Sequence, residues 1–290
     1  MDRQTIARAC HDIGFANRVG EAQGLFLSGP NVILGAAGQF TLNATAQRPL
    51  LLETLNVEAA LGNVNALGTI SAINVAGQSA LTSNAVCGIS MFRSTSFCAK
   101  SRALGISVDN NMQVTVIGNV GAAANVSLAI GCQPIPSAMV KTRAQQAEAY
   151  NYVHGLGSLA VPAGATATMT SVSQRAVTLG SIVMELGSAG NIDDMYVTSF
   201  RISGLEQLAG QTGQQQVPLA AFLENASMCN DLTLGICINP QAQIDIDIQN
   251  IGGAPVTVNG GIFCLPWSGK SAQLPSRPAI STYKATRSKK

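Results

Sequence analysis

Short runs in which apolar residues alternate with small or polar ones recur along most of the chain. Period-two alternation is the pattern of a strand that buries one face, and Asn, Gly or Pro between runs supply the turns. Asp109-Asn110-Asn111 and Asn239-Pro240-Gln241 are two such turn segments. The sequence therefore predicts an all-β protein of antiparallel strands. The clearest runs carry their apolar residues at Ile106 and Val108, Val114 and Val116, Val126, Leu128 and Ile130, Ile236 and Ile238, Ile244, Ile246 and Ile248, and Val256 and Val258.

The strand pattern occurs twice. The segment TLNATAQRPLL aligns with TMTSVSQRAVT at an offset of 127, which places Gln47-Arg48 on Gln174-Arg175. Further on, the segments that begin at Phe92 and Phe222 align without a gap at an offset of 130. The change in offset falls opposite the polar run GQTGQQQ, and insertions are tolerated in loops. We infer an internal duplication and predict two units of roughly eight strands each.

Helical patterns lie outside the two copies. Near the N-terminus, Asp2 is placed to cap a helix whose Ile6, Cys10 and Ile13 share one face. Between the copies, SAMVKTRAQQAEAYNYV is rich in helix-forming residues and predicts a linker helix that ends near His154. The predicted organisation is an amphipathic arm (1–29), a first β-sandwich (30–134), the linker helix (135–156), a second β-sandwich (157–268) and a basic C-terminal tail (269–290).

Composition narrows the class of protein. Charged residues make up only 11% of the chain, whereas hydrophobic residues make up 47%. A surface so poor in charge repels its neighbours weakly and suits burial in an assembly. The seven cysteines contain no C-x-x-C pair, which argues against a disulfide framework or a zinc site and favours reduced thiols made in a cytosol. No stretch approaches the roughly 20 apolar residues that a membrane helix needs.

Residues that could carry catalysis are scarce. His11 and His154 are the only histidines, and the pattern places each in a helix and neither on a barrel strand. No nucleophile elbow and no phosphate-binding loop is present. Asp245 and Asp247 alternate with isoleucines, so we predict that they lie on the solvated face of one strand. Asp193-Asp194 follows a turn with no further ligand. The chain is expected not to be an enzyme, with no catalytic residue, no cofactor and no metal site.

With two copies of an eight-stranded unit, the chain resembles the double jelly-roll major capsid proteins of tailless icosahedral viruses. This lineage includes the adenovirus hexon and the coat proteins of membrane-containing bacteriophages. The resemblance covers residues from about 30 to 268 and rests on duplication, length and strand pattern. It implies two tandem jelly rolls, a homotrimer that imitates sixfold symmetry, a capsid lattice with minor capsid or vertex proteins as partners, and a place in the virion after synthesis in the host cytoplasm.

Two sets of basic residues are candidates for contacts. The duplicated Arg48 and Arg175 fit either equivalent contacts between subunits or the covering of apolar surface at a strand edge. After Asp247 the chain has no acidic residue and six basic ones. If the resemblance holds, this tail lies near an internal lipid membrane or packaged nucleic acid, although a tail ordered on a neighbouring subunit is equally compatible. The tail residues considered for such contacts are Arg277, Lys284, Arg287, Lys289 and Lys290.

Two other classes stay open. A trimeric receptor-binding or carbohydrate-binding virion spike would use the same sandwich, but Trp267 is the only tryptophan available for stacking on sugars. A bicupin-type metalloenzyme also consists of two fused jelly rolls. Its metal site needs several His with a carboxylate in each barrel, and the two histidines of this chain are not duplicated.

Overall fold

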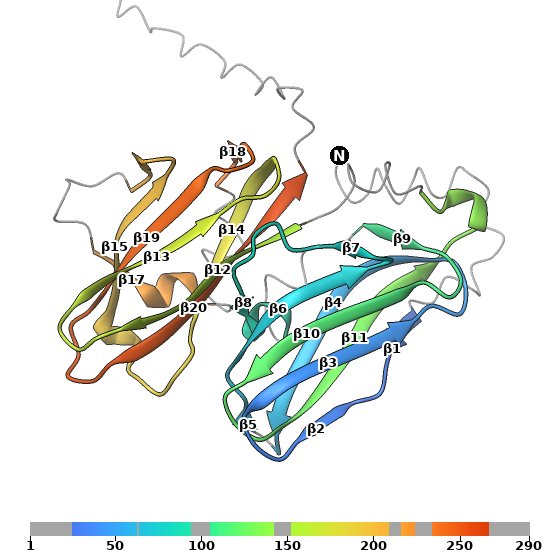
Figure 1. Ribbon diagram of the computed structural model, residues 1–290, viewed down its shortest axis with the longest axis horizontal. Coiled ribbons are helices and arrows are strands. Elements are labelled where there is room, and N and C mark those ends of the chain that lie inside the picture. The colour runs from blue at the N-terminus through green and yellow to red at the C-terminus, as the bar shows by residue number, and fades with distance from the viewer. Residues whose placement is uncertain are drawn as a thin grey trace, which may run out of the picture.

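The computed structural model describes residues 25–62, 64–93, 105–141, 152–208, 216–223 and 234–266. They form an all-β protein of antiparallel sheets, arranged as two units that lie side by side (Figure 1). We name residues 25–134 unit 1 and residues 152–266 unit 2. In each unit two sheets pack face to face around buried apolar side chains.

Unit 1 contains sheets A and B. Sheet A has the order β1-β11-β4-β5, with β2 also paired to β11 and β9 to β4. Sheet B has the order β3-β10-β6-β7, with β8 also paired to β6. The bounds are β1 (Leu25–Ser28), β2 (Val32–Leu34), β3 (Gly38–Thr45), β4 (Leu50–Leu61), β5 (Val64–Asn65), β6 (Gly68–Val75), β7 (Gln78–Ser79), β8 (Cys87–Gly88), the 3-10 helix η2 (Ile89–Phe92), β9 (Ile106–Val108), β10 (Gln113–Val120), β11 (Ala124–Pro134) and then η3 (Ser137–Met139).

Unit 2 contains sheets C and D. Sheet C has the order β12-β20-β14-β18, and sheet D has the order β13-β19-β15-β16, with β17 also paired to β15. The bounds are β12 (Tyr152–Val161), β13 (Thr166–Val172), β14 (Val177–Leu186), η4 (Ile192–Asp194), β15 (Met195–Ile202), β16 (Leu205–Glu206), β17 (Val217–Pro218), η5 (Leu219–Phe222), β18 (Ile236–Ile238), β19 (Gln243–Asn250) and β20 (Val256–Pro266).

The elements of unit 2 follow those of unit 1 at the offsets found in the sequence. β3, β4, β6 and β7 recur as β13 to β16 at the first offset, and β8, η2, β9 and β10 recur as β17, η5, β18 and β19 at the second. Unusual backbone conformations recur too: Ala76 and Ser203 both have φ of 50°, and Asn111 and Gln241 have φ of 62° and 71°. The last strands, β11 and β20, are displaced slightly further because the loop after β19 is longer than the loop after β10.

The predicted period-two alternation is confirmed in the strands of both units. Along β10, Val114 and Val116 are buried while Thr115 and Ile117 between them are half-exposed. Along β19, Ile244, Ile246 and Ile248 are buried in the same way. Alternating side chains point to opposite faces of a strand, so these residues fill the space between the two sheets of each unit.

The structure corrects the predicted boundaries. The linker helix was expected to reach residue 156, but β12 begins at Tyr152 and pairs with β20, so unit 2 begins earlier than residue 157. Unit 1 likewise begins before residue 30, because Leu25–Ser28 pairs with β11 as β1. Residues 142–151 and the predicted N-terminal helix lie outside the described residues. Among the residues that the structure describes, no helix has the length and apolar character needed to cross a membrane.

Candidate functional site

A buried seam joins the two units. The segment between β7 and β8 of unit 1 pairs with β12 of unit 2. Val153 N donates to Ala80 O at 3.0 Å, and Thr82 N donates to Val153 O at 2.8 Å. The hydroxyl of Ser83 donates to Gly155 O at 2.7 Å. Because these bonds satisfy backbone groups from both units, neither unit can move away without leaving buried polar groups unpaired.

His154 stands on β12 at this seam, which corrects the prediction that it lies in a helix. Its Nδ1 is 3.0 Å from Thr82 Oγ1 of unit 1, and its Nε2 is 2.8 Å from Ser171 Oγ of β13. The side chain has 0% exposure. Burial lowers the pKa of His154 to about 4, so the imidazole is neutral near pH 7 and pairs with one hydroxyl through each ring nitrogen.

The Ser171–His154 pair has the spacing of a nucleophile and its base. Ser171 is only 5% exposed, however, and His154 and Thr82 are 0% exposed. A catalytic nucleophile must meet its substrate, and these three side chains are buried. The arrangement is therefore suited to tying β12, β13 and unit 1 together, and not to acyl transfer.

Glu185 places a second polar group in the seam. It is buried on β14, where Oε2 accepts the backbone N–H of Ser90 at 3.3 Å and Oε1 accepts Asn259 Nδ2 at 3.4 Å. Burial raises the pKa of the neighbouring Cys87 thiol, and the charge of Glu185 raises it further. Cys87 is therefore a protonated, unreactive packing residue. Glu185 helps to fix the position of η2 on sheet C, because moving η2 would remove one hydrogen-bond donor from a buried carboxylate.

Apolar packing completes the seam. The rings of Phe92 and Phe263 meet edge to face, with centroids 6.3 Å apart. A Cβ at Gly261 would collide with Met91 Sδ and would lie 3.0 Å from Cys87 Cβ. Glycine at this position of β20 thus allows η2 of unit 1 to lie directly on sheet C of unit 2.

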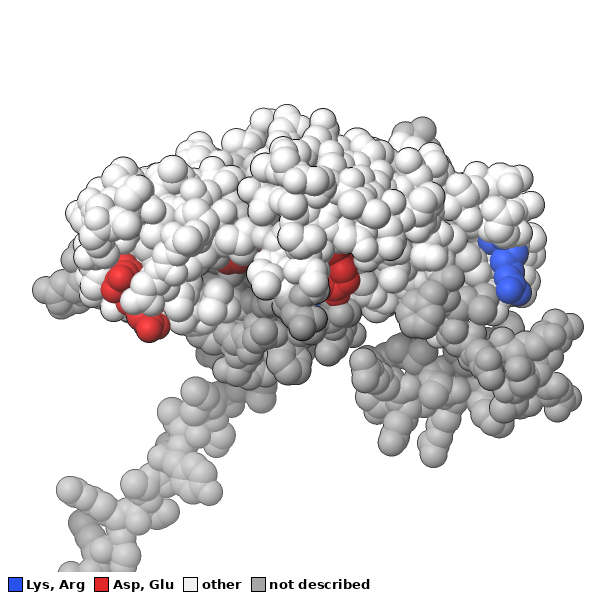
Figure 2. All heavy atoms as spheres, turned by 90° about the horizontal axis from the view of Figure 1, so that it is seen from below, with Lys and Arg blue, Asp and Glu red and all other residues white. Residues whose placement is uncertain are grey.

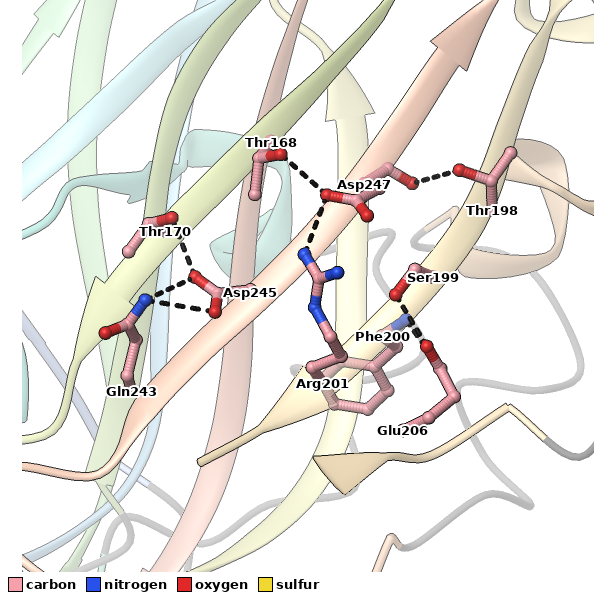
Figure 3. Close-up of polar contacts among 10 residues, drawn as sticks. All are labelled: Thr168, Thr170, Thr198, Ser199, Phe200, Arg201, Glu206, Gln243, Asp245 and Asp247. Carbon is pink, nitrogen blue, oxygen red and sulfur yellow. Dashed lines mark hydrogen bonds and ion pairs between the residues drawn. The ribbon is translucent and has the colours of Figure 1, made fainter. Parts of the chain in front are cut away.

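The outer face of sheet D carries the polar side chains drawn in Figure 3. Asp247 accepts Thr168 Oγ1 at 2.6 Å and pairs with Arg201 at 3.1 Å. Asp245 accepts Thr170 Oγ1 at 2.8 Å. The prediction that both aspartates lie on the outer face of one strand is confirmed, since the isoleucines between them are buried. Each carboxylate is matched by hydroxyl or guanidinium donors from the adjacent strands.

Glu206 closes the same face at the turn after β15 (Figure 3). Burial acts to raise the pKa of Glu206, but its hydrogen bonds favour the ionised form more strongly and hold the pKa below its usual value. The donors are Ser199 Oγ at 2.6 Å and the backbone N–H groups of Phe200 at 2.9 Å, Leu208 at 3.0 Å and Gln207 at 3.2 Å. This carboxylate caps a turn.

We expect the substitution Asp247→Asn to change the free energy of unfolding by less than about 1 kcal/mol, because ion pairs open to solvent contribute little. The side chains of Arg201 and Asp247 are 37% and 18% exposed, and an amide oxygen still accepts from Thr168. Urea titration of this variant beside Asp245→Asn measures the effect. A loss several times larger for Asp247→Asn alone would show that the outer face of sheet D holds more than a solvated network.

The two candidate arginines lie in different surroundings. Arg48 is exposed in the turn between β3 and β4. Arg175 is half-buried, and its guanidinium lies 5.0 Å from the ring centroid of Tyr152 at the start of β12. Arg175 thus covers an aromatic ring of its own unit. The candidate tail residues Arg277, Lys284, Arg287, Lys289 and Lys290 lie outside the described residues.

The described part of the chain offers few grouped metal ligands. No group of three or more His, Cys, Asp or Glu side chains that could hold a metal ion occurs within the described ranges. The described cysteines are free thiols, with Cys87, Cys132 and Cys264 buried and Cys237 exposed. Asp193 and Asp194 lie in η4, where the side chain of Asn191 accepts the N–H of Asp193.

Charge is divided unevenly along the chain. Only five of the 17 Lys and Arg residues belong to the described residues, against nine of the 15 Asp and Glu residues. Figure 2 shows one broad face of the molecule on which charged side chains are few and far apart. Several large apolar side chains are exposed as well. They include Ile33, Leu61, Val64, Leu205 and Ile251.

A comparison of the sequence with models of protein families and with curated proteins found no match. Among solved structures, the chain is similar to the recombinant N-glycanase F (PNGase F) at 11% sequence identity. That match covers 83% of this chain and 95% of the other, with a TM-score of 0.32. A likeness at this TM-score supports no argument about fold or function.

Proposed function

We propose that the chain is the major capsid protein of an icosahedral virion and assembles as pseudo-hexameric trimers. The observation that carries the proposal is the structural repeat: two units with one strand order, fused by a buried seam. A closed shell is built from many similar contacts. Three copies of a two-unit chain present six similar units, which is the number that packs in a hexagonal lattice.

We further propose that each unit is a jelly roll, an eight-stranded double sheet found in viral capsids. When the eight principal strands of unit 1 are numbered along the chain, sheet A has the order 1-8-3-6 and sheet B the order 2-7-4-5. The principal strands of unit 2 follow the same two orders in sheets C and D. The strands so numbered are β1, β3, β4, β6, β8, β9, β10 and β11, and then β12, β13, β14, β15, β17, β18, β19 and β20.

The surface and the seam support a structural role. A surface with few charges and several exposed apolar side chains favours burial against neighbouring copies. The bicupin alternative requires a ligand set in each barrel. The counterpart of His154 in unit 1 is Leu27, since each pairs with the equivalent residue of the last strand, Ile262 and Ile130. A metal site duplicated with the units therefore has no support.

Light scattering and electron microscopy of the purified full chain test the proposal. We expect particles with three times the 29.9 kDa mass of one chain and a hexagonal outline, or closed shells built from them. A chain that stays monomeric at high concentration contradicts the proposal. Trimers that bind glycans and never form a lattice favour the spike, and metal bound in stoichiometric amount favours the bicupin.

A further inference from the structure

The seam inside the chain joins two different surfaces. One is an edge of unit 1, residues 87–92, which we name the donor edge. The other is the outer face of sheet C in unit 2, which we name the acceptor face. All residues of both surfaces are buried. The acceptor face consists of Gly155, Val183, Glu185, Asn259, Gly261 and Phe263.

Unit 1 has its own copy of the acceptor face on the outer side of sheet A. Glu58 pairs with Ser127 across β4 and β11 there, as Glu185 pairs with Asn259 across β14 and β20. The repeat aligns Glu58 with Glu185 at its first offset. The counterpart face is half-exposed, and Ser28 on it is fully exposed. Its residues are Ser28, Asn56, Glu58, Ser127, Ala129 and Gly131.

Unit 2 has its own copy of the donor edge, residues 217–222. In unit 1 all six residues of the edge are buried, whereas in unit 2 only Leu219 is. Phe222 corresponds to Phe92, and Ala220 corresponds to Ser90. Ser90 contacts Glu185 through its backbone N–H, so an alanine at the equivalent position keeps that donor. Among the described residues, each copy of the chain therefore carries one face and one edge that are more exposed than their counterparts in the seam, and we call these two surfaces uncovered.

We propose that the donor edge of unit 2 in one copy docks on the acceptor face of unit 1 in a second copy, in the manner of the seam within the chain. The occupant is a second copy because the two uncovered surfaces are the repeat counterparts of the two surfaces that already meet in the seam. In this contact Glu58 takes the place of Glu185 and accepts the N–H of Ala220. The inference rests on the proposed function, in which neighbouring copies meet in a trimer.

The side chains that would meet in this contact differ in size from those that meet in the seam. Met91 packs over Gly261 in the chain, and its counterpart Ala221 would face Ala129, so the edge is smaller where the face is larger. Phe222 would face Gly131, where Phe92 meets Phe263 in the chain. The paired side chains are smaller than those of the seam in both cases, with two heavy atoms in place of four in the first, so this contact buries less apolar side chain than the seam does.

One substitution demands an adjustment. Pro218 stands where the donor edge of unit 1 has Gly88, and a Cβ at Gly88 would collide with Oε1 of Glu185. That atom is the end of a flexible side chain. The next atoms that such a Cβ would meet, Cδ at 2.7 Å and Cγ at 3.0 Å, belong to the same side chain. Glu58 must therefore take a rotamer different from that of Glu185 to admit Pro218.

The contact is head to tail, because the donor edge and the acceptor face are different surfaces. Head-to-tail contacts either close into a ring or continue as a filament. Each new copy covers one face and one edge and presents one more of each. A closed ring of three copies then contains six units and leaves no face or edge uncovered.

Single arginine substitutions on each surface test the inference. Ala129→Arg blocks the face, and Ala220→Arg blocks the edge; both side chains are half-exposed, so the fold should tolerate them. We expect each variant to be a monomer by native mass spectrometry, at concentrations where the unmodified chain is a trimer. Thr45→Arg adds the same charge on the outer face of sheet B and should remain trimeric. Ser28→Arg on β1 is a second face variant should Ala129→Arg fail to fold.

Mixing the two monomeric variants separates a head-to-tail contact from any other. The Ala129→Arg copy keeps its edge and the Ala220→Arg copy keeps its face, so the mixture should form a one-to-one dimer and stop there. The inference is wrong if either variant still forms trimers, or if the two monomeric variants do not combine. In both cases the trimer formed by the unmodified chain would still agree with the proposed function. An unmodified chain that never oligomerises instead removes the proposed function.

Discussion

Replacing Gly155 by Ala is expected to destabilise the protein by about 3 kcal/mol and to part the two units, because the new methyl group would enter the backbone of the seam. A Cβ at residue 155 would collide with Ala85 O and lie 2.7 Å from Val86 O and 2.8 Å from Ala85 C. Backbone atoms cannot rotate away as a side chain does. The segment between β7 and β8 must therefore move off β12 and break the bond from Ser83 to Gly155 O.

Guanidinium unfolding and small-angle scattering measure the two consequences of this change. Gly253→Ala is the matched control, since nothing lies within 4 Å of a Cβ there and the residue is exposed in the loop after β19. The control should keep the stability and the radius of gyration of the unmodified chain. Gly155→Ala should unfold at lower denaturant and scatter as a longer particle. If the two variants are equally stable, the backbone of the seam can accommodate the methyl group without loss of free energy, and close contact at Gly155 does not hold the units together.

Much of the fold was readable from local pattern and from the repeat. The alternation in β10 and β19 follows from burial on one face only, and the turns after Asp109 and Asn239 occur where turn residues stand. The two offsets of the alignment reappear element by element because both units bury the same positions. Such patterns can be predicted because each arises within a single strand and does not depend on residues distant in sequence.

The start of β12 was predicted wrongly for a physical reason. Residues 137–151 include four Ala, two Gln and one each of Met, Lys, Arg and Glu, all of which favour helices, so the predicted helix was extended beyond the residue where the strand begins. Tyr152 and Val153, which favour strands, were the available signal. What decides the conformation there is long-range pairing with β20 and with the segment before β8, and neither partner is near in sequence.

The seam escaped prediction because its polar members come from distant parts of the chain. Thr82 lies far before His154 in the sequence, and Ser90 lies even further before Glu185. One clue was present in the alignment: Glu58 and Glu185 fall on each other at its first offset. Few charged residues recur between the two copies, so a glutamate found at the same position in both indicates that this surface has the same role in each unit.

Acid should weaken the seam through His154, and replacing this residue should remove that part of the pH dependence. The usual histidine pKa is about 6.5 in an unfolded chain, and burial lowers the pKa of His154 to about 4. Above pH 6.5 the imidazole is neutral in both states and makes no difference. As the pH falls from 6.5 to 4, the unfolded chain takes up a proton that the folded chain excludes. Stability therefore falls over this window by up to about 3 kcal/mol, and changes no further through this group below pH 4.

Unfolding titrations at pH 8, 6, 5 and 4 on three proteins isolate the effect: the unmodified chain, His154→Gln and His11→Gln. Carboxylates with a lowered pKa, such as Glu206, also make the protein less stable as the pH falls. This contribution is the same in all three proteins and cancels when their free energies of unfolding are subtracted. His154→Gln should start lower at pH 8, because an amide replaces the imidazole between Thr82 and Ser171, and should then lose less on acidification. His11→Gln should keep the full slope. If the pH dependence of stability is unchanged in His154→Gln, another group takes up the proton, and the imidazole does not make the seam sensitive to pH.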